Sequence, residues 1–161
     1  MEQNRYEPPR APVDPRTREP GSIAKAVAIG AAIDIGGTLA GGIVIGLAYS
    51  VLLGIQGRSS AEVERALTTF DPFSMFGLTL MVMGVAMSAF GGFQCAVIAN
   101  RATYIAPGIM SLISVTSGAM MNDGQVPLPQ LLLMSGLTVA AILGGASMQI
   151  RKLAPPARPS A

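Results

Sequence analysis

The chain has 161 residues, of which 50% are hydrophobic and only 12% are charged, whereas soluble domains carry about 25% charged residues. The net charge of +2 is too small to indicate a nucleic-acid partner. The single cysteine excludes an intramolecular disulfide, and the absence of histidine removes the commonest metal ligand and the commonest general base.

Four nearly uncharged runs dominate the chain. They cover residues 26–53, 73–98, 103–121 and 126–150. A helix crosses a hydrocarbon core of ~30 Å with roughly 20 residues, and each run meets or nearly meets that length. The sequence therefore predicts an all-α, polytopic membrane protein, with four transmembrane helices in an antiparallel bundle and the lipid bilayer around them.

The segments outside these runs are polar and rich in proline. We expect residues 1–22 to form a disordered cytoplasmic arm and residues 153–161 a disordered tail, because such segments bury too little apolar surface to offset the entropy of ordering. Residues 23–152 then form the transmembrane domain. The first apolar run starts late and is too long for the core of a signal peptide, so we interpret it as an uncleaved span.

The connection after the first run has helical features of its own. Ser59 and Glu62 have the spacing of a capping box, in which each side chain binds a free amide at the helix start. Val63, Leu67 and Phe70 then fall on one helical face. We expect an amphipathic helix over residues 59–70, lying on the external surface of the membrane.

The basic residues predict the orientation. With four spans, nine of the eleven Lys and Arg residues lie on the side that carries both termini, and only Arg58 and Arg65 lie on the other side. Cytoplasmic loops are enriched in Lys and Arg, so we expect both termini in the cytoplasm.

Small residues recur at four-residue spacing in every run. Because no hydrophobic force drives helices together in lipid, close approach of backbones at such residues supplies the contact. We interpret them as packing within the bundle, or as an interface with a second copy or a larger membrane-protein partner. The residues are Gly37, Gly41, Gly42 and Gly46 in the first run, Gly84, Ser88 and Gly92 in the second, Ser114 and Gly118 in the third, and Gly136, Ala140 and Gly144 in the fourth.

Asp34 is the one Asp, Glu, Lys or Arg residue inside a predicted span, and so the one side chain there that ionises readily near neutral pH. Residues 36–55 can span alone, so we favour a position for Asp34 near the cytoplasmic interface, in water or paired with Lys25 or Arg101. Two alternatives stay open: a role in packing or assembly, and a place on an ion or proton pathway. Arg101 can also anchor the end of the second span by snorkelling.

The methionines offer one further possibility. Met83 and Met87 have a spacing that suits a soft copper(I) site. Methionine is also a common filler among glycines, and we favour packing. We expect no metal, no cofactor and no catalytic residue.

Two short motifs carry a resemblance. Residues 4–9 read NRYEPP, and Gly91, Gly92 and Phe93 precede Asn100, Arg101 and the third run. The first resembles the Asn-x-Tyr-x-Pro-Pro lead, and the second the GGF/Y hairpin, of small uncharacterised bacterial four-span inner-membrane proteins. This resemblance implies a fold and a location in the inner membrane, and no activity. Small multidrug exporters also place an acidic residue in the first of four spans, but this chain is longer and lacks their aromatic substrate cage.

The sequence thus predicts a bacterial inner-membrane protein that is not an enzyme and acts by helix–helix assembly with itself or a partner. The alternative is a small transporter or channel that uses Asp34 in the first span.

Overall fold

The computed structural model of the chain describes residues 20–69, 71–121 and 126–153. Regular structure in these residues is entirely helical, which confirms the all-α prediction. The elements are α1 (Ile23–Ala31), the π-helical turn η1 (Ala32–Gly36), α2 (Gly37–Ile55), α3 (Ser60–Thr68), α4 (Met75–Ala99), α5 (Ile105–Met120) and α6 (Leu128–Leu153).

Three helices in the described part of the chain are long and apolar enough to cross a membrane. They are Ile23–Ile55, in which α1, η1 and α2 are continuous, Met75–Ala99 and Leu128–Leu153. At ~1.5 Å per residue even the 25 residues of α4 reach about 38 Å, more than the ~30 Å hydrocarbon core. The length and apolar composition of these helices support the prediction that the chain is a membrane protein.

The third predicted span is shorter than expected. α5 has 16 residues and reaches only about 24 Å. Asn100 ends α4 in the left-handed conformation, with φ of 47°, and the chain bends through residues 101–104 before α5 begins. The apolar run 103–121 is therefore not helical over its whole length, and three spans, not four, meet the length of a bilayer in the described residues.

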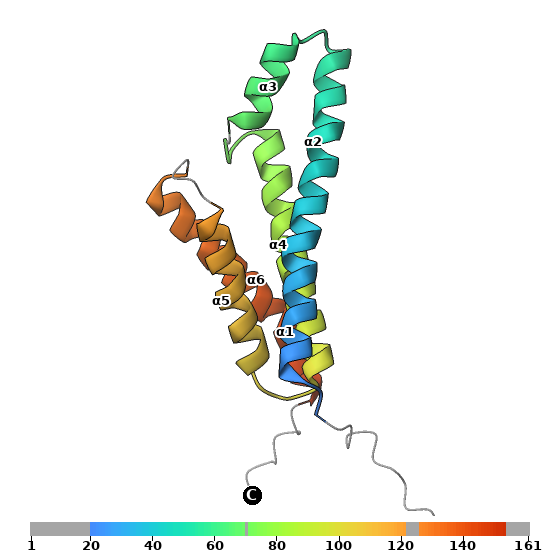
Figure 1. Cartoon of the computed structure of the whole chain (residues 1–161), viewed down its shortest axis with the longest axis vertical. Helices are drawn as coiled ribbons and strands as arrows, with labels where there is room; N and C mark the ends of the chain where they lie inside the picture. The colour runs from blue at the N-terminus through green and yellow to red at the C-terminus, as the bar shows by residue number, and fades with distance from the viewer. Residues whose placement is uncertain (1–19, 70, 122–125, 154–161) are drawn as a thin grey trace, which may run out of the picture.

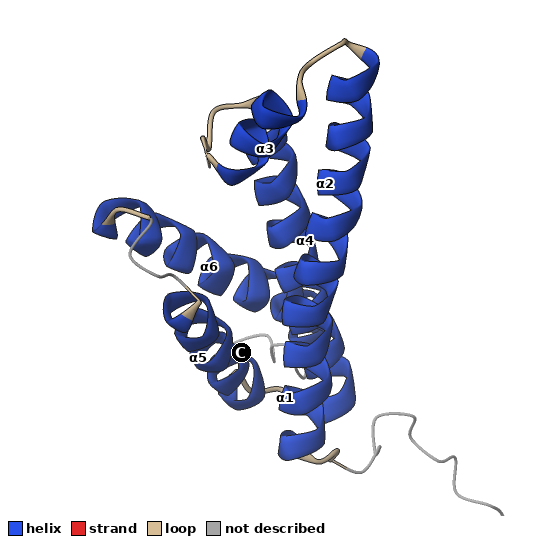
Figure 2. Ribbon diagram, turned by 45° about the horizontal axis from the view of Figure 1, so that its top comes forward, coloured by secondary structure: helices blue, strands red, loops and turns tan. Residues whose placement is uncertain are grey.

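The helices separate into two arms that meet at one end of the molecule. The start of α1, the end of α4, the start of α5 and the end of α6 gather there, and the Gly21 amide donates to the Ala99 carbonyl at 3.0 Å (Figure 1). From this end α5 and α6 lean away from α2 and from the first half of α4, toward the end that carries α3 (Figures 1 and 2).

Two glycines make the crossing of α1 and α4. A Cβ added to Gly30 would press on the Gly91 carbonyl oxygen, and a Cβ added to Gly91 would press on the Gly30 carbonyl oxygen, at 3.0 and 2.7 Å. The two backbones thus touch directly. A side chain at Gly91 would force the two backbones apart, and one at Gly30 would crowd Met110 and Cys95 as well, so glycine is favoured at both positions.

The crossing of α4 and α6 is built in the same way. A Cβ on Gly92 would run into the backbone of Ile142, and a Cβ on Gly145 would run into the backbone of Ala89. The adjacent Gly91 and Gly92 therefore let α4 contact two different helices at one level. The fully buried Cys95 and Met110 pack nearby.

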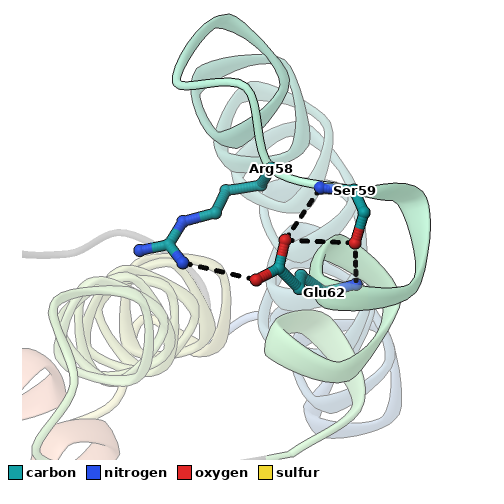
Figure 3. Close-up of polar contacts among 3 residues, drawn as sticks. All are labelled: Arg58, Ser59 and Glu62. Atoms are coloured by element: carbon teal, nitrogen blue, oxygen red, sulfur yellow. Dashed lines mark hydrogen bonds and ion pairs between the residues drawn. The ribbon is translucent and has the colours of Figure 1, made fainter.

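The short helix α3 begins with the predicted capping box (Figure 3). The Ser59 amide donates to Glu62 Oε2 at 2.9 Å, and the Glu62 amide donates to Ser59 Oγ at 3.4 Å. Arg58 pairs with Glu62 Oε1 at 3.4 Å. The hydrogen bonds from Ser59 lower the pKa of Glu62 below its ordinary value of 4.5. The helix ends at Thr68.

Some predictions fall on residues that the structure does not describe. These are the disordered arm for residues 1–19, the disordered tail for residues 154–161, the contact face at Phe70, and the turn over residues 122–125. Residues 20–22 lead directly into α1, where Ser22 Oγ accepts from the Lys25 amide.

Candidate functional site

Asp34 occupies the π-helical turn η1, at the point where α1 gives way to α2. A π turn contains one residue more than the α-helical turn it replaces, and such turns are frequent at functional sites. The side chain of Asp34 is only 4% exposed. The expectation that the side chain of Asp34 lies in water is therefore wrong.

Two serines from other helices bind the carboxylate. Ser88 Oγ, in α4, donates to Asp34 Oδ1 at 2.6 Å, and Ser114 Oγ, in α5, donates to Asp34 Oδ2 at 2.5 Å. Both serines are buried. Each carboxylate oxygen thus has a hydroxyl donor, so the side chain needs no water to satisfy it. This explains how Asp34 is accommodated inside the bundle.

No cation of the protein neutralises this carboxylate within the described residues. The ion pair found there joins Arg58 to Glu62, far along the chain in the α2–α3 connection. Lys25 and Arg101, the two partners that we considered for Asp34, are both exposed. Buried charges in proteins are usually paired or bind metals, so an unpaired buried carboxylate is unusual.

Asp34 also borders a cavity of about 310 Å³. Residues of α2, α4, α5 and α6 line this cavity together with Asp34 and Ile35 of the π turn. Its polar lining consists of Asp34, Thr38, Ser88, Ser114, Ser117 and Thr138. Its apolar lining consists of Ile35, Leu39, Leu80, Met81, Val85, Met121, Met134 and Leu137, with Gly84 and Gly118.

The order of the lining residues along the helices gives the direction of the cavity. On α4 they run backward from Ser88 to Leu80, and on α5 they run forward from Ser114 to Gly118 and on to Met121, which directly follows the helix. Both directions lead toward the end of the molecule that carries α3 (Figure 1). The cavity therefore lies between the two diverging arms, with Asp34 at its inner end.

The small residues of the first span lie mainly against methionines. Added Cβ atoms on Gly37 and Gly41 would meet the side chains of Met87 and Met83. Gly42 has only Leu80 at 4.0 Å, and Gly46 has nothing within 4 Å. The two methionines that suggested a copper site thus fill the space beside glycines.

Along the other helices the predicted small residues have different surroundings. Gly84 lines the cavity, Ser88 binds Asp34, and Gly92 meets the backbone of α6. Gly136, Ala140 and Gly144 lie on the exposed face of α6, whereas its buried face consists of Ile142, Gly145, Ala146 and Ile150.

Our sequence interpretation missed the connection between Asp34 and the two serines. The four-residue spacing marks Ser88 and Ser114 only as small packing residues. The sequence feature that points to the connection is the presence of hydroxyl side chains in two apolar runs, since such groups need a hydrogen-bond partner in lipid.

Together, fold and site define an all-helical protein with membrane-length apolar helices and a buried, serine-bound carboxylate beside a cavity. No protein family, curated protein or solved structure matches the chain. The resemblance to small bacterial four-span proteins accordingly stays a prediction.

Proposed function

We propose that the protein is a small membrane transporter or channel in which Asp34 binds a cation or a proton on the pathway. The observation that carries this proposal is the position of Asp34: buried, held by Ser88 and Ser114, and at the inner end of a cavity.

The energetics of the site support this role. Burying an ion costs several kcal/mol even after the protein relaxes, and hydrogen bonds to a charged group return about 1.5–3 kcal/mol each. The two serine hydroxyls together return about 3–6 kcal/mol, which offsets much of that cost and lets a carboxylate lie inside the bundle. Carboxylates inside membrane-spanning segments are rare and often mark ion or proton pathways, where the acid must keep its charge available.

The proposed arrangement in the membrane has four spans, with α5 and its flanking apolar residues as the third. Both termini are in the cytoplasm of a bacterium, and the bilayer is its inner membrane. The basic residues Lys25, Arg101, Arg151 and Lys152 support this orientation. They lie at the start of α1, just after α4 and at the end of α6, which are helix ends that gather where the two arms meet (Figure 1). The cavity then faces the external side.

Ion flux tests the proposal. The protein is reconstituted into lipid vesicles, and proton and sodium fluxes are measured under a gradient of each ion. We expect a flux that Asp34→Asn abolishes, because asparagine keeps the shape but carries no charge. The matched control is Glu64→Gln, which removes a carboxylate from the exposed surface of α3. Flux that is equal in both variants and the unaltered protein would contradict the proposal.

A second candidate function is helix–helix assembly, as a non-enzymatic protein that binds a second copy or a larger membrane-protein partner. The exposed stripe of Gly136, Ala140 and Gly144 on α6 favours it, because added Cβ atoms at Gly136 and Gly144 meet nothing within 4 Å. Disulfide cross-linking through a cysteine at position 140, with Cys95 replaced by alanine, tests for a symmetric contact. A cysteine at the lipid-facing position 48 is the control, and equal cross-linking at both positions would exclude this stripe as an interface.

A further inference from the structure

The charge of the cavity lining indicates the sign of the charge that a ligand would carry. Asp34 is the one ionisable side chain among the described residues that line the cavity. An anion would be repelled by the carboxylate, and a neutral ligand would leave it without a counter-charge. The cavity therefore favours a cation.

The hydrogen-bonding groups at the inner end narrow the class of cation. A hydroxyl has one donor and two acceptor lone pairs, and Ser88 and Ser114 both use their donor on Asp34. Asp34, Ser88 and Ser114 therefore have only hydrogen-bond acceptors left for a ligand. A ligand that carries N–H donors can bind to these acceptors.

The lining disfavours one common type of organic cation. Quaternary ammonium groups, which have no N–H donor, are usually recognised by aromatic rings. None of the described lining residues is aromatic. The inner end thus suits an ammonium group that donates hydrogen bonds.

The outer part of the cavity suits an apolar group. Leu39, Leu80, Met81, Met121 and Met134 line it on the side toward the α3 end, beyond the serines. Methionine side chains are flexible and adapt to ligands of different shape. The volume of about 310 Å³ is at the lower limit of cavities that hold organic ligands, which indicates a small molecule.

We propose that this cavity binds a small amphipathic primary or secondary ammonium ion, with its N–H groups on Asp34, Ser88 and Ser114 and its hydrocarbon part among the leucines and methionines. The inference rests on the proposed function, since it assigns a substrate class to the same site.

Binding to the full-length protein in lipid nanodiscs tests this assignment by calorimetric titration at pH 7. The probes are hexylammonium, hexyltrimethylammonium, hexanol and sodium ion. We expect saturable binding of hexylammonium, at least tenfold weaker binding of hexyltrimethylammonium, and no saturable binding of hexanol. Asp34→Asn is expected to weaken hexylammonium binding at least tenfold, while Glu64→Gln leaves it unchanged.

A second variant tests the cavity while the carboxylate is kept. Gly118 lines the cavity and a Cβ there meets nothing within 4 Å, so Gly118→Leu fills space without pressing on the backbone. We expect it to weaken hexylammonium binding at least tenfold. Gly46→Leu, which also has open space but lies outside the cavity lining, is the matched control and is expected to bind normally.

Three results would overturn the inference: equal hexylammonium binding by the unaltered protein and Asp34→Asn, equal binding of the primary and quaternary ions, or normal binding by Gly118→Leu. These failures are distinct from failure of the proposed function. An Asp34-dependent flux of protons or sodium without hexylammonium binding overturns the ligand class alone. Hexylammonium binding without any Asp34-dependent flux of protons, sodium or hexylammonium itself overturns the transport role alone.

Discussion

At the scale of single residues, the two serines determine how Asp34 is held. Ser88→Ala and Ser114→Ala each leave one carboxylate oxygen without its donor. We expect each change to lower the free energy of unfolding by about 1–2 kcal/mol. Reversible unfolding in mixed micelles measures this.

A double-mutant cycle between Asp34 and Ser88 distinguishes loss of their hydrogen bond from loss of packing by the serine side chain. When Asp34 is already asparagine, Ser88→Ala should cost measurably less than it does in the unaltered protein. Purely additive losses would show that the charge of Asp34 adds nothing to the hydrogen bond with Ser88.

The surroundings of Asp34 could not be predicted from its local sequence. Hydropathy identified it as an acid within an apolar run, but its partners are 54 and 80 residues away. Which serines meet it depends on how α4 and α5 rotate about their axes. Small residues on several faces of each helix left that rotation open.

At the scale of helices, glycine positions differ sharply in what they tolerate. Gly92→Ala places a methyl group against the backbone of Ile142, which cannot yield as a side chain can. We expect a loss of about 1–3 kcal/mol in unfolding free energy, typical of overpacking. Gly136→Ala, on the exposed face of α6, should be neutral or gain up to about 1 kcal/mol from helix propensity. Thermal and denaturant unfolding in detergent compare the two; similar losses would refute the assigned packing face.

The same helices show what a spacing pattern can predict. Of the glycines that four-residue spacing marked, Gly92 lies at a backbone contact, whereas Gly46, Gly136 and Gly144 have nothing within 4 Å of an added Cβ. On α6 the pattern marked Gly136, Ala140 and Gly144, but α6 packs with the neighbouring Gly145 and Ala146. In a helix where several faces carry small residues, spacing alone does not choose among them.

The start of α3 should respond to acid. The pKa of Glu62 is lowered in the folded protein by the hydrogen bonds from Ser59. Its contribution to the helix is therefore complete above the ordinary value of 4.5 and is lost as the pH falls through the lowered value. We expect amide hydrogen exchange in residues 60–68, corrected for intrinsic rates, to show less protection at pH 3 than at pH 6. In Glu62→Gln this difference should shrink, and an equal difference in both proteins would mean that other groups cause it.

At the scale of the whole molecule, the ends of the helices predict a topology. Reporters fused after Lys152 and within residues 100–102 should behave as cytoplasmic, and a reporter within residues 58–66 as external. The basic residues at the end where the arms meet motivate this expectation. An external reporter at residues 100–102 would mean that the chain between α4 and α5 lies on the opposite side.

α5 is the helix whose insertion this experiment decides. Its 16 residues reach about 24 Å, so it spans only if the bilayer thins locally or its apolar flanks extend into the interface. If the reporters after Lys152 and within residues 100–102 are on one side, α5 and α6 either both cross or both do not, and the membrane length of α6 favours a pair that crosses. Hydropathy predicted the run, but it does not reveal that Asn100 ends α4 in the left-handed conformation and that the chain bends over residues 101–104 before α5 begins.

The π turn has a genetic consequence. Each residue of an α-helix advances the next by about 100°, so one surplus residue rotates everything that follows it by that amount. Gly30, before Asp34, meets Gly91, while Gly37, after it, meets Met87, and both belong to one continuous helix. An in-frame deletion of a single codon within residues 32–36 would restore a regular helix, yet only one of these two alignments could survive it. The geometry of the carboxylate site therefore depends on the number of codons over residues 32–36 as well as on the residues that they encode.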